Sequence, residues 1–447
     1  MIANQMTKKL RKDANEILSV CLEAADPEKA VRRFVQLDGA SLRVHPDFSV
    51  DLADVGRIVI VGVGKGSAPM AKALEDMLGD HVHSGAICVK YGHGLPLKKV
   101  RVFEAGHPVP DTSGQEAAQE IMRLLASLEE SDLVISCISG GGSALLPAPA
   151  SGITLGDKQE LTRRLLVAGA DIHEINAVRR HLSASKAGRL MRLAYPAFVI
   201  NLMLSDVVGD DPATIASGPF APDGSTFADA LSIIERYELM DKVSSAVAQH
   251  IRDGADGKIE ETPKKEDQIF SRVLNVIVGS SILSLDAGRE KAKELGYRTL
   301  ILSSAIEGDT AEAARFHGAL ADEIRRSGNP LRPPACLLSG GETTVVVKGD
   351  GLGGRNQHFV LSLVRKASKI PNTLFLSAGS DGTDGPTDAA GAVADNFTLD
   401  RAQSLGLNPD EFLKDYDSYH FFEKLGDLVF TGPTRTNVMD IRIVLIS

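Results

Sequence analysis

A buried strand that runs directly into a glycine-rich turn constrains the fold of this chain more than any other feature. Residues 132–138 (DLVISCI) are apolar and partly β-branched, and the turn SGGGS follows at 139–143. Apolar runs of this length are typical of strands in a parallel sheet, which is covered on both faces. Glycines let the backbone turn sharply and bring bare amides close to an anion such as phosphate. A single copy fits equally well a tight turn that packs beneath its own sheet.

The same design, a strand followed by a glycine-rich turn, recurs three more times, and this favours ligand binding. The clearest repeat is a strand at 57–61, the turn GVGKGS at 62–67 and a helix over 68–78, which together predict the first unit of a doubly wound α/β fold. The turn satisfies neither the dinucleotide fingerprint, which needs Gly at Ser67, nor the P-loop, which needs Ser or Thr at Gly66. The candidate phosphate-binding residues of the two turns are Gly62, Gly64, Gly66, Ser67, Ser139, Gly140, Gly141, Gly142 and Ser143.

Three charged side chains follow predicted strands or turns and are candidates for chemistry. Lys65 lies at the carboxyl end of a strand, where ligand crevices of α/β folds form, although a solvated loop lysine is the alternative. Asp206 follows the apolar run 198–204 and could hold Mg²⁺ or accept a proton, and the sequence does not separate these roles. Arg355 offers a planar fork for a carboxylate, and Asn356 beside it could bind a substrate hydroxyl.

Several other polar residues have both a functional and a structural interpretation. Asp381 and Asp384 lie on a glycine turn and are candidate ligands of a metal or a hydroxyl, or simply an Asp-Gly turn pair. The predicted helix over 173–195 has a basic face that includes Arg179, which suits an anionic substrate or is an ordinary solvated face. His107, which precedes a proline, stays open between a structural and a catalytic role.

The length of 447 residues is too great for one ordinary core, so two or three domains are expected. The polar stretch at 253–268 allows a boundary, and we expect one domain over 1–255 and a second over 270–447. The first begins with a helix over 6–37, and the second contains a hairpin strand at 343–347.

Composition excludes several classes of protein. A net charge of −10 without a block of lysine and arginine argues against a nucleic-acid binder. There is no run of about 18 apolar residues, so no membrane span is predicted. The four cysteines lie far apart without a C-x-x-C motif, which indicates buried thiols in a reducing cytosol. We therefore expect a cytoplasmic protein, and whether it forms a homo-oligomer is left open.

Eight short motifs occur along the chain in an order that resembles the class II glycerate kinases, whose C-terminal part is the MOFRL domain. They are VGVGKGS (61–67), GHPVP (106–110), SGGGSA (139–144), NAVR (176–179), LSDV (204–207), SGGETTV (339–345), GRNQ (354–357) and SDGTDGPT (380–387). The resemblance covers nearly the whole chain. It implies two α/β domains, an N-terminal Rossmann-like domain with a doubly wound parallel sheet and a C-terminal α/β MOFRL domain, with the active site in the cleft between them.

The activity that the resemblance implies is phosphorylation of D-glycerate to 2-phosphoglycerate, with ATP and Mg²⁺. Phosphoryl transfer needs mostly positioning and neutralisation of developing charge, which the two glycine turns and Lys65 could supply. The expected catalytic residues are Lys65, Asp206 and Arg355. The expected substrate ligands are Arg179, Arg355 and Asn356, and the expected metal ligands are Asp206, Asp381 and Asp384.

Two alternatives are kept. Close relatives of this family are often labelled hydroxypyruvate reductases, but an NAD(P)H site needs a complete G-x-G-x-x-G with a downstream acidic residue, which the chain lacks. An inactive ligand-binding regulator is disfavoured because Lys65, Asp206 and Arg355 are all present.

Overall fold

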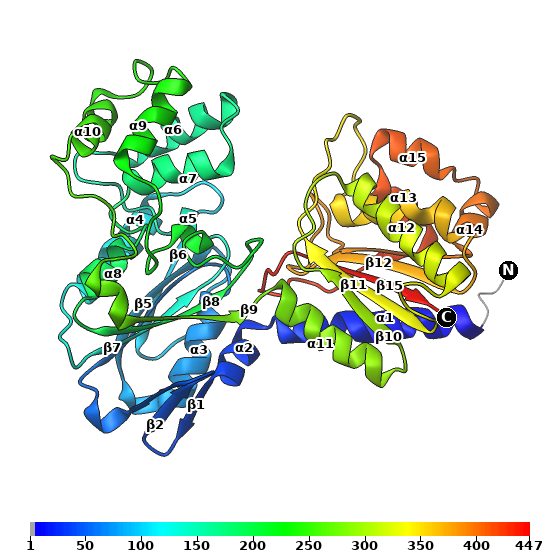
Figure 1. Ribbon diagram of the computed structural model, residues 1–447, viewed down its shortest axis with the longest axis horizontal. Helices are drawn as coiled ribbons and strands as arrows, with labels where there is room; N and C mark the ends of the chain where they lie inside the picture. Colours follow the sequence, from blue (N-terminus) through cyan, green and yellow to red (C-terminus); the bar gives the residue numbers. More distant parts are fainter. Residues whose placement is uncertain (1–4) are drawn as a thin grey trace. The chain divides into compact units, whose positions relative to one another are not determined.

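The computed structural model describes residues 5–447, and their contacts divide into two compact units, both drawn in Figure 1. The N-terminal unit comprises Ala30–Leu204 and Asp210–Val278. The C-terminal unit comprises Gly279–Ser447, the short segment Ser205–Gly209 and the described residues up to Lys29. No helix within residues 5–447 is long and apolar enough to cross a membrane.

The two units differ from the predicted ranges of 1–255 and 270–447. Helix α1 (Gln5–Ala24) packs its apolar face into a core of the C-terminal unit. Strand β9 (Val273–Gly279), which the prediction gave to the second domain, joins the sheet of the N-terminal unit. The sequence shows that a helix has an apolar face but not which sheet covers it, and this explains the difference.

A six-stranded sheet forms the centre of the N-terminal unit. Its strands lie in the order β6-β5-β4-β7-β8-β9, and the registered pairs from β6 to β8 are all parallel. Counted along the chain, this is the 3-2-1-4-5-6 order of a Rossmann fold, which reverses between β4 and β7. The predicted doubly wound α/β sheet is thereby confirmed. The bounds are β4 (Ile58–Val63), β5 (Val82–Lys90), β6 (Val100–Ala105), β7 (Leu133–Ile138) and β8 (Phe198–Leu204).

The predicted helix over 6–37 is wrong in its second half. After α1 comes a separate helix α2 (Pro27–Phe34), because Pro27 can begin a helix but cannot continue one. Three short antiparallel strands follow: β1 (Val35–Asp38), β2 (Ser41–Val44) and β3 (Phe48–Asp51). The helices nearest the central strands are α3 (Ser67–Leu78), α4 (Thr112–Leu125) and the four-residue α5 (Gly142–Leu145).

Four helices surround another apolar core of the N-terminal unit and are drawn above the sheet in Figure 1. They are α6 (Leu155–Val167), α7 (Ile172–His181), α9 (Phe227–Arg236) and α10 (Ser245–Ala255). The predicted single helix over 173–195 is wrong, because α7 ends at His181 and α8 (Arg189–Ala194) begins after a turn at 182–188. Gly188 in this turn has a φ of +74°, a left-handed conformation that interrupts the helix and suits glycine.

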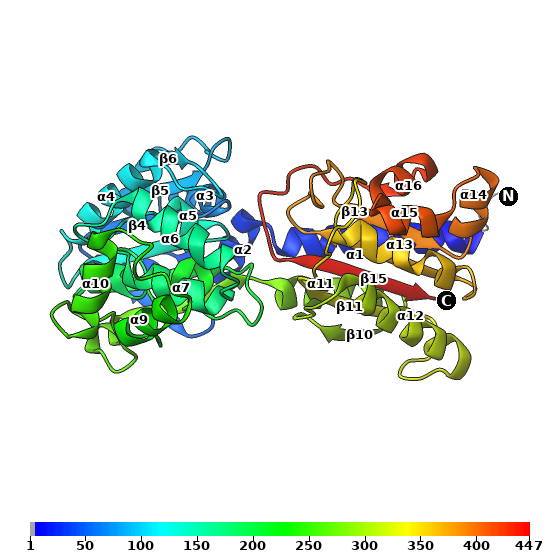
Figure 2. The same cartoon turned by 90° about the horizontal axis from the view of Figure 1, so that it is seen from above.

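The C-terminal unit contains a mixed sheet in the order β10-β11-β15-β12-β13-β14. Strand β15 is antiparallel to both of its neighbours and runs through the middle of this sheet in Figures 1 and 2. Helices α1 and α11 cover one face, and α12 and α13 cover the other. The strands are β10 (Arg298–Ser303), β11 (Ala335–Gly341), β12 (Thr373–Gly379), β13 (Gly391–Asp395), β14 (Leu428–Val429) and β15 (Asp440–Ile446). The helices are α11 (Ser281–Glu294), α12 (Thr310–Ser327) and α13 (Arg355–Ala367).

The predicted hairpin strand at 343–347 is absent from the described structure. Residues 342–354 form a loop in which only Thr344 makes an isolated bridge, to Asp309. A hairpin would have paired residues 343–347 with β11. Strand β15 takes this place, because it is buried along its whole length and fits the centre of a sheet that is covered on both faces.

Candidate functional site

The two predicted glycine turns follow β4 and β7, the central strands at which the sheet order reverses. In open α/β sheets, ligands bind at the carboxyl ends of strands at such a point. The turns interlock, because the Lys65 amide donates to the Gly140 carbonyl and the Gly66 amide donates to Ser139 Oγ, each at 2.9 Å. Gly64 has a φ of +130°, and a Cβ at this position would lie 2.3 Å from Ser139 Oγ. Glycine is therefore required for the turns to approach each other so closely.

This interlocking uses some of the groups that we expected to hold phosphate. The amides of Gly64, Ser67 and Gly142 donate to carbonyl groups within the N-terminal unit, at 3.1–3.3 Å. Ser67 Oγ donates to the Cys137 carbonyl at 2.8 Å, and both serines at 67 and 139 are buried. These contacts stabilise the turns, and the phosphate-binding role of the two turns stays a prediction.

Positive charge gathers around the half-buried Lys65. The Lys65 carbonyl oxygen lies 3.3 Å from His93 Nδ1. The ring of His107 lies against Gly141, where a Cβ would come within 2.9 Å of its Cδ2 atom. Burial lowers the pKa of His107 to about 4, and the charges of Lys65 and Lys90 act in the same direction. His107 is consequently neutral at pH 7, and the net charge around Lys65 favours an anion.

A second group of cations converges on the hydroxyl of Ser143, at the start of α5. Arg179 Nη2 and Lys186 Nζ each donate to Ser143 Oγ at 2.8 Å, and Ser217 Oγ lies 3.0 Å from the same oxygen. Lys186 also donates to the Ser143 carbonyl at 2.8 Å. A hydroxyl has two acceptor positions and one proton, so Ser143 accepts from both cations and donates to Ser217. Ser143 therefore orients Arg179 and Lys186.

Lys158 of α6 interacts electrostatically with Arg179 of this second group. It is buried, and its Nζ atom has no hydrogen-bond partner among residues 5–447. Burial lowers the pKa of Lys158 to about 7, with a further lowering by Arg179 and Arg189. Burial also lowers the pKa of Lys186 well below its ordinary range, and the charges of Arg179 and Lys158 add to this. The three cations therefore repel one another inside the protein.

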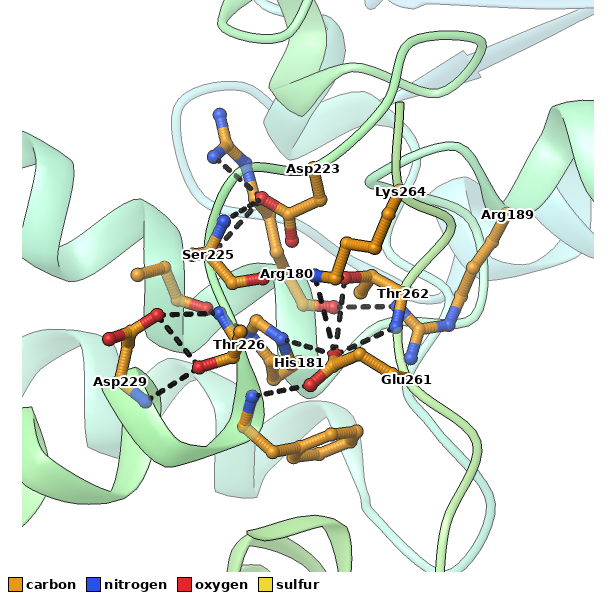
Figure 3. A network of polar contacts seen from close by, with 12 residues as sticks. Arg180, His181, Arg189, Asp223, Ser225, Thr226, Asp229, Glu261, Thr262 and Lys264 are labelled. Carbon is orange, nitrogen blue, oxygen red and sulfur yellow. Dashed lines mark hydrogen bonds and ion pairs between the residues drawn. The ribbon is translucent and has the colours of Figure 1, made fainter. Parts of the chain in front are cut away.

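Figure 3 shows that the acidic side chains nearby serve other partners. Asp223 accepts from Arg180 Nη1 at 3.1 Å, and Glu261 Oε1 lies 2.9 Å from His181 Nε2. Both carboxylates also act electrostatically on Arg189. In the described chain, no carboxylate forms an ion pair with Lys158, Arg179 or Lys186.

In the C-terminal unit, Arg355 begins α13 and is held by two carboxylates. Its Nε atom donates to both oxygens of Asp440, at 2.9 and 3.0 Å, and its Nη1 atom donates to Glu342 at 2.5 Å. Burial opposes the charged form, but Asp440 and Glu342 outweigh it, so the pKa of Arg355 is raised. The guanidinium lines a pocket of about 580 Å³ whose wall includes Thr343 and Asp381. Arg355 is thus fixed in direction and accessible from the pocket.

Asn356 and Asp384 make hydrogen bonds at the start of α13, and their predicted roles as ligands of substrate and metal stay predictions. Both amide hydrogens of Asn356 are used, because Nδ2 donates to Asp384 at 3.2 Å and to Asp440 at 2.9 Å. Asp384 accepts from the backbone amides of Asn356 and Gln357, at 3.0 and 2.8 Å, and so satisfies the first turn of α13. Burial raises the pKa of Asp384 to about 6, although these hydrogen bonds oppose the rise. Both side chains therefore support the helix start, and Asp384 also lines the pocket beside Arg355.

Asp381 forms the turn that the structural alternative predicted. Its Oδ1 atom accepts from the amide and the hydroxyl of Thr383, each at 3.1 Å. Asp206 follows β8, is half-buried and is grouped by its contacts with the C-terminal unit. Its role as base or metal ligand stays a prediction. Among residues 5–447, no three His, Cys, Asp or Glu side chains form a group that could hold a metal ion.

Comparison with known proteins identifies the family. Residues 13–252 match a domain of unknown function, DUF4147, and residues 335–440 match the MOFRL family. The chain is 39% identical to a glycerate 2-kinase of Pyrococcus horikoshii, with 98% of each chain covered. The chain belongs to the glycerate 2-kinase family. The structure is also similar to a crystal structure of a glycerate kinase from Thermotoga maritima. The two chains are 39% identical and superpose with a TM-score of 0.89, over 98% of this chain and 100% of the Thermotoga chain.

One relative of this chain is named as a reductase instead of a kinase. A protein of Agrobacterium vitis that bears the name hydroxypyruvate reductase is 43% identical and covers 88% of this chain and 100% of its own. The alternative named in the sequence analysis thus appears among the relatives. The resemblance inferred from the eight motifs is confirmed by the family match.

The sequence analysis missed Lys90 and Lys158. A signal for Lys158 existed, because it shares the buried stripe of α6 with Leu161 and Leu165 at helical spacing. A lysine in an apolar stripe is expensive to bury and therefore calls for an explanation. Lys186 was included in the basic stretch but was assigned to a helix, whereas it lies in the turn that brings it to Ser143.

Proposed function

We propose that this protein transfers the γ-phosphoryl group of ATP to the 2-hydroxyl of D-glycerate, which yields 2-phosphoglycerate and ADP. The observation that carries the proposal is the full-length similarity to a glycerate 2-kinase at 39% identity. The N-terminal unit supports it independently, because its glycine turns lie at the sheet position where α/β proteins bind ligands and carry Lys65 among other cations.

In the proposed reaction, Lys65 neutralises charge on the transferred phosphoryl group, and the two glycine turns bind the phosphates of ATP. Arg355 binds the carboxylate of glycerate. Because Nε is bonded to Asp440 and Nη1 to Glu342, Nη2 is the guanidinium nitrogen that donates to neither carboxylate, and we propose that it contacts the ligand. Asp206 orients or deprotonates the 2-hydroxyl. Phosphoryl transfer of this kind depends on positioning and charge neutralisation, which these groups can supply.

We propose Mg²⁺ as the divalent ion that accompanies ATP. Mg²⁺ in kinases is commonly held by one or two carboxylates together with the phosphates of the nucleotide. Asp206, Asp381 and Asp384 are the proposed protein ligands, and Asp381 and Asp384 line the pocket beside Arg355. We also propose a cytoplasmic location, since all four cysteines are buried and unpaired, as in proteins of reducing compartments.

A coupled assay tests the reaction and its regiochemistry. We expect ADP to form only with D-glycerate, ATP and a divalent ion present together. Enolase should consume the product directly, without phosphoglycerate mutase, because enolase acts on the 2-phosphate isomer. A product that needs the mutase would reject the proposed position of transfer.

Reduction of hydroxypyruvate is the second candidate, favoured by the name of the Agrobacterium vitis relative. The same preparation is therefore assayed for NADH and NADPH oxidation with hydroxypyruvate. Nicotinamide-dependent turnover without ADP formation would replace the proposed kinase reaction.

A further inference from the structure

We propose that Lys158, Arg179 and Lys186 form a binding site for an oxyanion, a carboxylate or phosphate group of the ligand, in the N-terminal unit. The proposal rests on the kinase reaction for the identity of its ligands, D-glycerate and ATP. It adds Lys158 and Lys186, which lie outside all the sequence motifs that identified the family.

The first argument is the geometry around Ser143. Arg179 from α7 and Lys186 from the turn after it use the same hydroxyl oxygen as acceptor, each at 2.8 Å, so their cationic groups are close neighbours. A neutral hydroxyl orients two cations but does not compensate their charge. Two like charges held together away from water destabilise a protein unless an anion joins them. The arrangement is what a site prepared for an anion requires.

The second argument is the buried ammonium of Lys158. This side chain is 7% exposed, and its Nζ atom has no hydrogen-bond partner in residues 5–447. Burial of a lysine without a partner disfavours its charged form, and a buried polar nitrogen without a hydrogen bond is itself unfavourable. The charge of Arg179 lowers the pKa of Lys158, and the charge of Lys158 lowers the pKa of Lys186, so the three groups act on one another electrostatically.

The third argument is the contrast with adjacent cations. Arg180 follows Arg179 directly and pairs with the buried Asp223, and Arg189 is acted on by Asp223 and Glu261 (Figure 3). Acidic partners are thus available in this part of the fold, yet none pairs with the cluster around Ser143. The uncompensated charge is specific to one cluster, and a bound oxyanion supplies the missing partner.

The variant Lys158→Met tests the site, because methionine preserves most of the length and removes the charge. Each of three probes, inorganic phosphate, D-glycerate and ATP, is titrated separately by calorimetry. We expect the Kd of at least one probe to rise about tenfold or more, the scale of losing a hydrogen bond between charged groups. A loss confined to D-glycerate identifies the carboxylate as the bound group and would contradict its assignment to Arg355, and a loss confined to ATP identifies a phosphate.

The melting temperature of the ligand-free protein separates binding from a structural role. We expect it to rise in Lys158→Met, because the variant removes an unpaired buried charge. A lower melting temperature with unchanged affinity for all three probes would overturn the proposal. Arg163→Met is the matched control on the same helix, since Arg163 is exposed and pairs with Glu160, and it should leave every Kd unchanged.

A second variant and a separate readout keep this proposal distinct from the kinase reaction. Arg179→Met should weaken binding of the same probe as Lys158→Met, and weakening of a different probe would contradict a shared site. ADP formation by the unmodified protein is measured independently. Phosphate binding that depends on Lys158 in a protein without kinase activity would reject the kinase proposal alone, whereas kinase activity with probe affinities indifferent to Lys158 would reject the oxyanion site alone.

Discussion

The cations of this protein differ in how the fold holds them. Arg355 is fixed by two carboxylates, and its charge is largely compensated within the C-terminal unit. Lys65 is fixed through its backbone by Gly140, while its side chain remains half-buried among other positive groups. A guanidinium held by carboxylates can bind an anion in a fixed orientation, whereas a cation without a carboxylate partner attracts anions by its net charge.

Replacement of Lys65 tests its proposed role at the phosphoryl group. We expect Lys65→Ala to lower kcat about 10²-fold or more, the usual effect of removing one preorganised electrostatic group. The melting temperature should change little, because the contacts that fix the turn come from the backbone. Lys72→Ala is the control, since Lys72 pairs with Asp76 on the exposed side of α3. A nearly normal kcat in Lys65→Ala would indicate a solvated loop lysine.

The lowered pKa of Lys158, about 7, predicts that ligand binding takes up protons. At pH 8 most of the free protein has a neutral Lys158, and a bound oxyanion favours its charged form. The neighbouring Arg179, Lys186 and Arg189 are basic groups whose charges disfavour it. Calorimetry in two buffers with different ionisation enthalpies should show net proton uptake, which is smaller in Lys158→Met. Equal uptake by both proteins would contradict the prediction.

The same pKa determines how stability depends on pH. Between pH 7 and the ordinary range of a lysine, the unfolded chain binds a proton at residue 158 that the folded chain does not. The free energy of unfolding should therefore rise with pH across this window, because the unfolded state binds more protons. Denaturation at a series of pH values should show a flatter rise in Lys158→Met.

At the scale of elements, two short segments carry much of the candidate chemistry. The turns after β4 and β7 are locked to each other by backbone and serine hydrogen bonds. The start of α13 is locked by Asp384, which reaches it from a loop beyond β12. In both cases a residue distant in sequence supplies the hydrogen-bond partner, so local patterns could not reveal the arrangement.

Replacing one carboxylate oxygen tests the support of α13. Asp384→Asn keeps one acceptor but places an amide group against an N–H donor of the helix start, so we expect a loss of stability of about 1–3 kcal/mol. Asp381→Asn is the control, because both of its hydrogen bonds go to Oδ1, which asparagine retains. Its free energy of unfolding should change by less than about 0.5 kcal/mol. Loss of activity in Asp381→Asn with unchanged stability would support the metal-ligand role.

At the scale of the whole molecule, the proposed reaction uses residues of both units, and Arg355 tests this. An ammonium cannot reproduce the planar fork that joins Asp440 and a ligand. Arg355→Lys should therefore raise KM for D-glycerate about tenfold or more and leave KM for ATP nearly unchanged. A rise confined to KM for ATP would assign Arg355 to the nucleotide.

The doubly wound parallel sheet of the N-terminal unit was predictable because the central strands β4 and β7 are short apolar runs followed by glycine turns. The mixed sheet of the C-terminal unit was less so. Strand β15 is as apolar as a parallel strand, and nothing in its residues shows that it enters between β11 and β12 in the opposite direction. Lys65 and Arg355 were predicted as site residues because they lie in motifs, whereas Lys158 lies in no motif and only its place in the apolar stripe of α6 indicates that it is buried.

The order in which a ribosome synthesises these elements differs between the two units. Every strand of the N-terminal sheet is made before residue 280, so this unit can fold while later residues are still being added. The core of the C-terminal unit joins α1, the first described helix, to β15, the final strand. The apolar face of α1 therefore stays without its native partners until the strands of the C-terminal unit have been synthesised.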